Sequence, residues 1–286
     1  MDKKYTIGII GKGFVGTAVA HGFSQGVGYD ANILIYDKDP AKSQNTLKEV
    51  VDQSDFIFVS VPTPSNKDGS INLNIVDEVI NDISNISSNH NPIVLLRSTI
   101  VPGTSREFQQ KYSGTKIVFN PEFLTERSAV FDFLSQTRYV LGGEKEDTKK
   151  VAELYRDRFG ETISIVETDF ESAELIKYVC NCFFATKVSF MNEMKQISDK
   201  VGADWDTVVE GFVRDGRVGH SHVNVPGPDG KFGFGGSCFP KDVQAMIEFF
   251  KENGLEATTL EGVWKTNLKV RPEKDWEKLK GRAVTE

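Results

Sequence analysis

The sequence lacks the features of secreted, membrane-spanning and nucleic-acid-binding proteins. Its three cysteines, Cys180, Cys182 and Cys238, are too few for a disulfide framework, which favours a cytoplasmic location. No apolar run approaches the roughly 20 residues of a membrane span, and the start, MDKKYTIGII, has no signal-peptide core. The 41 acidic residues outnumber the 34 basic ones, which argues against a nucleic-acid partner. We therefore expect a soluble cytoplasmic protein of α/β or helical class.

Short apolar runs alternate with helix-length amphipathic segments as far as about residue 168. The candidate strands are Tyr5–Ile10, Ile33–Tyr36, Phe56–Val61, Ile93–Arg97, Lys116–Phe119, Tyr139–Leu141 and Thr162–Val166. Strands that are apolar throughout are typical of sheets that helices cover on both faces. The alternation of such strands with helices predicts a doubly wound parallel sheet. We expect a Rossmann-type domain at residues 1–170.

The remainder of the chain lacks strand signals. In residues 171–201 apolar residues recur at three- and four-residue steps, and this pattern predicts one long helix. A helix this long and apolar usually packs on more than its own domain, so we expect a homodimer through it. Shorter helices are predicted near 206–212 and 241–251, separated by a coil rich in Gly and Pro at 215–237. Residues 171–286 should form an all-helical, dimerising domain.

A glycine pattern typical of dinucleotide binding follows the first predicted strand. In GKGFVG, three glycines have G-x-G-x-x-G spacing directly after an apolar strand and at the mouth of a predicted helix. Gly11 allows a tight turn, Gly13 a close approach of the pyrophosphate, and Gly16 close packing of helix on strand. The pattern predicts NAD binding, with a purely structural glycine turn as the alternative.

Two later positions fit the same cofactor. Asp37 ends the next predicted strand, where a carboxylate accepts hydrogen bonds from both ribose hydroxyls and repels a 2′-phosphate. This favours NAD over NADP, although the nearby Lys42 weakens the preference. Thr63, in the turn VPTP, follows a further strand and either lines the cofactor crevice or belongs to an ordinary turn.

Cys238 precedes a predicted helix in GFGGSCFPKD, where Pro240 suits the first helical turn. The N–H groups and dipole of a helix N-terminus lower the pKa of a thiol and favour the thiolate. The glycines leave room for a substrate, and Asp242 lies one turn along the helix. The pattern predicts a nucleophile, with a small buried residue as the alternative. No His stands at ligand spacing, so we expect no metal.

Two residue pairs share the spacing of one helical turn. Glu122 and Glu126, in NPEFLTE, follow a strand and are expected at a helix start, as a general base and an anchor. Lys177 and Asn181 lie on one face of the long helix, where they would stabilise a developing oxyanion. Either pair alone is more typical of a solvated helix face.

A series of blocks in chain order carries a family resemblance: GKGFVG, SVPTP, RSTIVPGTS, NPEFLTE, AELIKYVCN and GFGGSCFPKD. Over about residues 5–250 they resemble the UDP-glucose/GDP-mannose dehydrogenase family. The resemblance implies that two NAD molecules oxidise a nucleotide sugar twice at C6, with a covalent enzyme intermediate. UDP-glucose, oxidised to UDP-glucuronate, is the substrate that it favours.

The resemblance also implies roles for individual residues. Cys238 is the implied nucleophile, and Glu122 the base that activates water. The implied catalytic residues are Cys238, Lys177, Asn181, Glu122, Asp242 and Thr99. The implied cofactor-binding residues are Gly11, Gly13, Phe14, Val15, Gly16, Asp37, Lys42, Thr63, Thr99 and Glu126. The implied substrate-binding residues are Glu122, Phe123, Leu124, Lys177, Asn181, Phe234, Gly235 and, reaching into a neighbouring subunit, Arg217.

The sequence departs from the family pattern at its end. It stops at LKGRAVTE, about where a third domain that holds much of the nucleotide begins in the family, so it is either a short form or a truncated chain. Two alternatives also remain for the function. One is a single-oxidation dehydrogenase of the 3-hydroxyacid or 6-phosphogluconate type, and the other is a non-catalytic NAD-binding module.

Overall fold

The computed structural model describes residues 5–86 and 90–286, so the charged lead at residues 1–4 lies outside the described residues. The chain divides into two compact units. The first unit comprises Met1–Thr63 and Leu73–Lys177, and the second comprises Pro64–Asn72 and Tyr178–Glu286. The sequence did not indicate that the segment 64–72 belongs with the second unit.

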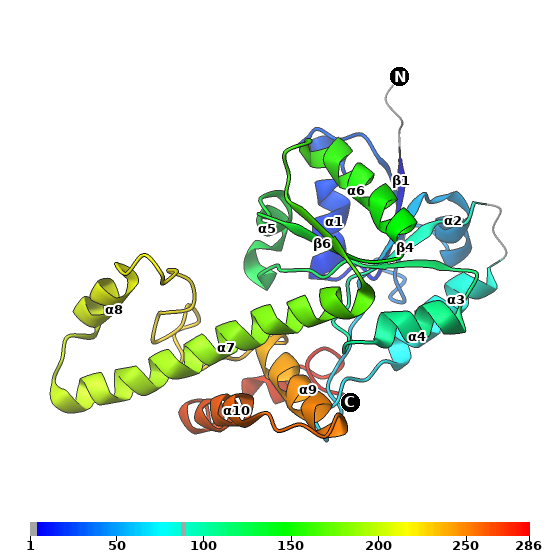
Figure 1. Ribbon diagram of the computed structural model, residues 1–286. Helices are drawn as coiled ribbons and strands as arrows, with labels where there is room; N and C mark the ends of the chain where they lie inside the picture. Colours follow the sequence, from blue (N-terminus) through cyan, green and yellow to red (C-terminus); the bar gives the residue numbers. More distant parts are fainter. Residues whose placement is uncertain (1–4, 87–89) are drawn as a thin grey trace. The chain divides into compact units, whose positions relative to one another are not determined.

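The first unit is built on a seven-stranded sheet (Figure 1). Its strands are β1 (Thr6–Ile10), β2 (Asn32–Tyr36), β3 (Phe56–Val59), β4 (Ile93–Leu96), β5 (Lys116–Phe119), β6 (Tyr139–Gly143) and β7 (Ile165–Thr168). The strand order is β2-β1-β3-β4-β5-β6-β7. The order therefore reverses between β1 and β3. Open α/β sheets bind ligands at such a switch point, outside the carboxyl ends of the strands.

All seven predicted strands are present, but the expectation of a wholly parallel sheet is wrong at one pairing. β5 and β6 are antiparallel, with Val118 opposite Gly143 and Phe119 opposite Gly142. The other pairings are parallel. An apolar run reads the same in both directions, so the direction of β6 could not be predicted from its composition.

Helices cover both faces of this sheet. One face packs on α1 (Phe14–Gly22), α5 (Ala129–Leu134) and α6 (Lys145–Phe159). The other packs on α2 (Leu47–Gln53), α3 (Asn74–Asn85) and α4 (Thr104–Lys111). Alternate residues of β3 supply the two cores: Phe56 and Phe58 enter the first, and Ile57 and Val59 the second. The doubly wound Rossmann arrangement is thus confirmed.

The second unit is helical, and the long predicted helix is present as α7 (Phe170–Val201), which has 32 residues. It begins in the first unit and continues in the second. The further helices are α8 (Trp205–Val213), α9 (Phe239–Glu252), α10 (Thr258–Val270) and the short η3 (Asp275–Lys278). The coil predicted at 215–237 has no helix or strand.

The expectation of two helices after the long one is wrong, because α10 is a third. Leu260, Val263, Trp264 and Leu268 have helical spacing, and Pro272 follows the last turn, so the signal was present. Within the described part of the chain, no helix combines the length and the apolar character needed to cross a membrane.

Candidate active site

The glycine turn between β1 and α1 has the geometry that a dinucleotide requires. Gly11 has a φ of +90°, and a Cβ on it would lie 2.7 Å from the carbonyl oxygen of Ser60. A Cβ on Gly16 would lie 2.1 Å from the carbonyl oxygen of Gly11, so only glycine lets α1 pack this closely. A Cβ on Gly13, the N-cap of α1, would meet nothing within 4 Å. This open space at a helix N-terminus fits a pyrophosphate.

Asp37 lies directly after β2 and connects that strand to the glycine turn. Its Oδ2 accepts a hydrogen bond from the backbone N–H of Lys12 at 2.6 Å, and its Oδ1 accepts one from Asp39 N–H at 2.8 Å. Each oxygen keeps a lone pair for a ribose hydroxyl. Lys42 forms an ion pair with Asp39 at 3.4 Å, which places its charge beside this carboxylate cluster.

The loops after β3 and β4 are joined by side-chain hydrogen bonds. Thr63 is buried and donates its hydroxyl hydrogen to the carbonyl oxygen of Thr99 at 2.8 Å. Ser98 donates in the same way to the carbonyl oxygen of Val61 at 2.7 Å. Both loops follow the carboxyl ends of central strands, so Thr63 and Thr99 lie at the edge of the sheet where this fold binds ligands.

Glu122 and Lys177 form a buried ion pair. The Lys177 Nζ lies 2.9 Å from Glu122 Oε1 and 2.6 Å from the carbonyl oxygen of Glu122. The second carboxylate oxygen accepts the N–H of Leu124 at 2.7 Å. Burial alone would raise the pKa of Glu122, but the Lys177 charge and these hydrogen bonds, with a smaller contribution from Arg97, hold it below its usual value. Glu122 is therefore a carboxylate at neutral pH.

The expectation that Glu122 and Glu126 occupy one helix start is wrong. Glu122 lies in the coil after β5, and Glu126 begins the short helix η2 (Glu126–Ser128) and is exposed. Phe123 packs under the guanidinium of Arg138, 4.1 Å from its ring centre, and Leu124 is buried in the core.

Cys238 is the N-cap of α9, as predicted, and Pro240 lies in the first turn of that helix. Its side chain is partly exposed, so the alternative of a fully buried small residue is wrong. The Ser237 Oγ lies 3.9 Å from the Cys238 Sγ. By contrast, Cys182 is buried in α7, and burial together with the charge of Asp242 raises its pKa far above the ordinary value. Cys182 therefore stays a thiol.

Buried polar side chains surround the first turn of α9. Asp242 is fully buried, and its Oδ2 accepts a hydrogen bond from the Asn181 side-chain amide at 2.6 Å. Its Oδ1 accepts one from the ammonium of Lys241 at 2.5 Å. Lys241 was not singled out in the sequence, although it stands in the block GFGGSCFPKD. Asn181 and Lys177 are both buried, so their interpretation as a solvated helix face is wrong.

The remaining predicted substrate residues lie in the coil of the second unit. Phe234 is buried, and Gly235 packs against the guanidinium of Arg271, which a Cβ on Gly235 would meet at 2.4 Å. The Arg217 side chain is 89% exposed and forms an ion pair with Asp215 at 2.6 Å. An arginine that reaches a neighbouring subunit has to be exposed in this way.

Glu174 is a further buried group that the sequence did not reveal. Its carboxylate accepts the N–H of Gly103 at 2.6 Å and that of Ser105 at 2.8 Å. It thereby caps the N-terminus of α4, directly after the loop that contains Thr99. The signal was its place in the block AELIKYVCN, where it precedes Lys177 by one helical turn.

Comparisons with known proteins match this arrangement unit by unit. Residues 41–158 match the NAD binding domain of the UDP-glucose/GDP-mannose dehydrogenase family. Residues 171–269 match the central domain of the same family. The chain belongs to this family. The matches confirm both the predicted family and NAD as the predicted cofactor.

Individual relatives are similar over most of the chain. The UDP-glucose 6-dehydrogenase of Rickettsia bellii is 37% identical, over 78% of this chain and 51% of that protein. The UDP-glucose 6-dehydrogenase TuaD of Bacillus subtilis is 34% identical, over 79% of this chain and 49% of that protein. A solved UDP-glucose dehydrogenase from Pyrobaculum islandicum superposes with a TM-score of 0.81 at 28% identity, covering 93% of this chain and 68% of that chain. The chain spans about half the length of the curated relatives it matches.

Proposed function

We propose that the protein is an NAD-dependent nucleotide-sugar 6-dehydrogenase that converts UDP-glucose, two NAD⁺ and water into UDP-glucuronate and two NADH. The observation that carries the proposal is Cys238 at the N-cap of α9, beside the buried Asn181–Asp242–Lys241 network. A hydroxyacid dehydrogenase performing one oxidation needs no such cysteine. The family match supports the same choice.

The first unit would hold the cofactor through the residues of the glycine turn. The N-terminus of α1 at Gly13 would face the pyrophosphate, and the lone pairs left on Asp37 would accept the ribose hydroxyls. NAD⁺ held there would supply the hydride acceptor for both oxidations at C6.

Cys238 would act between these two oxidations. Its thiolate attacks the C6 aldehyde to form a thiohemiacetal, and loss of a hydride and a proton turns this adduct into a thioester. Water then attacks the thioester carbon, the C–S bond breaks, and the sugar carboxylate and the free thiol are released. The helix N-terminus favours the thiolate that starts this sequence.

Glu122 and Lys177 would serve the steps at C6. The lowered pKa keeps Glu122 ionised at neutral pH, and a carboxylate is a group that could accept the proton of the attacking water. The Lys177 ammonium and the Asn181 amide are hydrogen-bond donors for the oxyanion at C6. Thr99 and Asp242 would support the water and the thiol.

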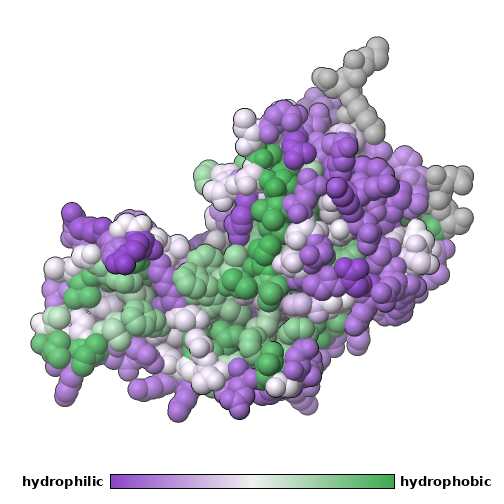
Figure 2. Space-filling model, viewed as in Figure 1, coloured by the Kyte–Doolittle hydropathy of each residue, from purple (hydrophilic) through white to green (hydrophobic). Residues whose placement is uncertain are grey.

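We also propose that two copies associate through α7 and α8. A stripe of apolar residues on α7 is exposed: Val179, Phe183, Phe190, Met194, Ile197 and Val201. Val208 and Phe212 of α8 continue it around a hollow of about 320 Å³. Figure 2 shows apolar side chains gathered over this part of the molecule. Exposed apolar surface of this extent marks an interaction site.

Cys238→Ser tests the mechanism, with Cys182→Ser as the matched control in the same unit. We expect wild type and Cys182→Ser to form two NADH for each UDP-glucose, and Cys238→Ser to lose more than about 100-fold in steady-state NADH formation. Undiminished turnover by Cys238→Ser would overturn the thioester mechanism. One NADH per substrate would favour the alternative of a single-oxidation hydroxyacid dehydrogenase. NAD binding without turnover would favour the alternative of a non-catalytic NAD-binding module. Assaying UDP-glucose, GDP-mannose and N-acetylated UDP-sugars in parallel identifies the substrate.

A further inference from the structure

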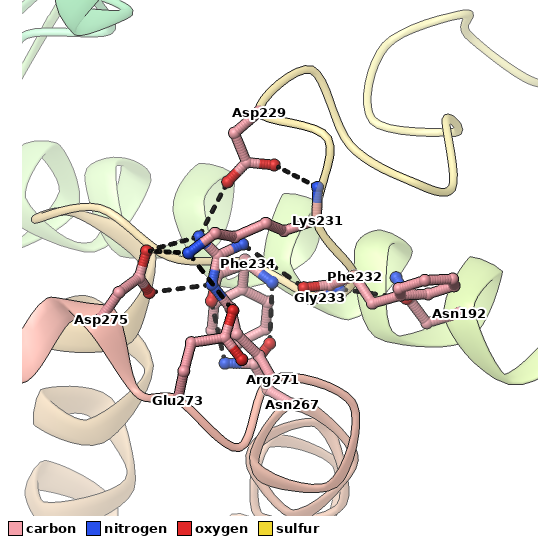
Figure 3. Close-up of polar contacts among 10 residues, drawn as sticks. All are labelled: Asn192, Asp229, Lys231, Phe232, Gly233, Phe234, Asn267, Arg271, Glu273 and Asp275. Atoms are coloured by element: carbon pink, nitrogen blue, oxygen red, sulfur yellow. Dashed lines mark hydrogen bonds and ion pairs between the residues drawn. The ribbon is translucent and has the colours of Figure 1, made fainter.

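The backbone before Cys238 is held by side chains rather than by regular secondary structure. Residues 232–237 contain no helix or strand, so no ladder of backbone hydrogen bonds fixes their course. Three buried side chains bind the backbone of this coil instead, and Figure 3 shows them converging on it. They come from α7, from α10 and from the residue after α10: Asn192, Asn267 and Arg271.

Asn267 binds both backbone groups of one coil residue. Its Oδ1 accepts the N–H of Phe234 at 2.7 Å, and its Nδ2 donates to the carbonyl oxygen of Phe234 at 3.0 Å. Asn267 is fully buried, so neither interaction competes with water. One residue earlier, the N–H of Gly233 donates to the Oδ1 of Asn192 at 3.0 Å. Side chains of two helices therefore fix consecutive peptide units of the coil.

Arg271 joins the coil to the turn that precedes it. Its Nη1 donates to the carbonyl oxygen of Phe232 at 3.3 Å, and its Nη2 donates to Asp229 at 2.8 Å. Asp275, one turn along the chain, orients the guanidinium through bonds of 2.9 and 2.7 Å. The side chain is only 2% exposed, so its charge depends on these two carboxylates.

Two glycines of the coil are in direct contact with the same side chains. A Cβ on Gly233 would lie 2.4 Å from Asn267 Oδ1, and one on Gly235 would lie 2.4 Å from Arg271 Nη2. Gly233 also has a φ of +66°, which other residues rarely adopt. These glycines therefore let Asn267 and Arg271 bind the coil closely, in addition to leaving room for a substrate.

We propose that Asn267 and Arg271 are positioning residues that set the place of the Cys238 thiol and of the Phe234–Gly235 backbone. The inference rests on the proposed function, in which this thiol and this backbone meet the sugar. Only Gly235, Gly236 and Ser237 separate the fixed peptide of Phe234 from the N-cap. Once the hydrogen bonds of Asn267 hold Phe234, only a few backbone dihedral angles can still change the position of the Cys238 sulfur. A displacement of 1 Å at a reacting group costs about 100-fold in rate.

Asn267→Leu and Arg271→Lys test this role. Asn267→Leu keeps the branching of the side chain and removes both bonds to Phe234, whereas Arg271→Lys keeps the charge and removes the paired bonds. Thr266→Val is the matched control, because the Thr266 hydroxyl donates to Glu193 of α7 and not to the coil. The readouts are kcat with UDP-glucose, the Kd of NAD, the unfolding midpoint, and the rate and pH midpoint of Cys238 alkylation by iodoacetamide, followed by peptide mass spectrometry.

We expect Asn267→Leu and Arg271→Lys to lower kcat at least about tenfold and to shift the alkylation rate and its pH midpoint. NAD affinity should stay at the wild-type value, and Thr266→Val should match wild type in every readout except the unfolding midpoint. Wild-type alkylation in both variants, with a lowered unfolding midpoint, would show a merely structural role and overturn the proposal. If Asn267→Leu does not fold, Arg271→Lys decides. If wild type oxidises no nucleotide sugar, the proposed function fails and the alkylation data alone decide the positioning role.

Discussion

Glu122 and Lys177 place two opposite charges where neither is stable alone. Their side chains are 7% and 3% exposed, so each has lost its hydration and depends on the other. Removing one partner of a buried pair leaves an uncompensated charge, whereas removing both costs much less. The stability of the folded protein therefore depends on Glu122 being ionised, which is also the state that the proposed general base requires.

Lys177→Met should destabilise the protein by roughly 3–5 kcal/mol, measured as the free energy of unfolding in urea at pH 7. Without the ammonium, burial raises the pKa of Glu122, so the stability of this variant should fall as pH rises through that new value. In wild type the lowered pKa has the opposite effect, and its stabilising contribution is lost on acidification. The double variant Glu122→Gln/Lys177→Met should recover most of the loss, and a strictly additive double variant would contradict the coupling.

Two glycines of the turn, Gly13 and Gly16, allow an effect on NAD binding to be separated from an effect on helix packing. Gly13→Ala adds a methyl group in open space but replaces a good N-cap residue by a poor one, so we expect a loss of about 0.5–1 kcal/mol and weaker NAD binding. Gly16→Ala places a methyl group against the Gly11 carbonyl and should cost about 1–3 kcal/mol. Isothermal titration with NAD and urea unfolding measure the two effects. Unchanged NAD affinity in Gly13→Ala would contradict the assigned pyrophosphate site.

At the scale of elements, Glu174 links α7 to the start of α4. Burial raises its pKa to about 7 even though it accepts two backbone hydrogen bonds. An unfolded glutamate titrates near 4.5, so between these values the folded protein holds a proton that the unfolded chain has released. By linkage, this group's contribution to stability is full below the unfolded pKa and is lost as pH rises through the folded one.

Glu174→Gln should therefore remove part of the pH dependence of stability. We expect wild type to lose free energy of unfolding, relative to Glu174→Gln, as pH rises from 5 to 8, by up to about 3 kcal/mol. The comparison is made by urea unfolding at unit pH steps. Lys111→Gln, which breaks an exposed ion pair between α4 and Asp77, serves as the control and should leave the slope unchanged. Parallel curves for wild type and Glu174→Gln would contradict the raised pKa.

Local signals were sufficient for some elements and not for others. The turn at Gly11–Gly16 and the start of α9 at Cys238 follow from glycine spacing and a proline, so they were predicted. The direction of β6 depends on pairing with β5, and the coil course of Glu122 depends on Lys177 of a distant helix. The hydrogen bonds between Asn267 and Phe234 were not predicted, because they join residues 33 apart in the sequence and Asn267 lies on a helix that was not predicted.

At the scale of the whole molecule, α7 carries a long stripe of exposed apolar residues. From Val179 to Val201 it runs for roughly 33 Å at 1.5 Å per residue. Phe183 is 63% exposed and Ile197 is 52% exposed, which is costly for side chains of this size in water. The spacing of three, four and seven residues keeps the stripe on one side of the helix, as in helices that pair along their length.

Phe190→Glu should accordingly shift the protein from dimer to monomer. The charge would lie beside the hollow between α7 and α8, where a second copy would have to desolvate it. Light scattering after size exclusion should give twice 31.9 kDa for wild type and a single chain mass for the variant. Leu255→Glu, at a residue 58% exposed just before α10, is the control and should remain dimeric. A wild type that is still monomeric at 100 µM would show that the stripe does not bind a second copy. At this concentration, about 10⁻⁴ M, any dimerisation free energy would then be weaker than roughly 5 kcal/mol.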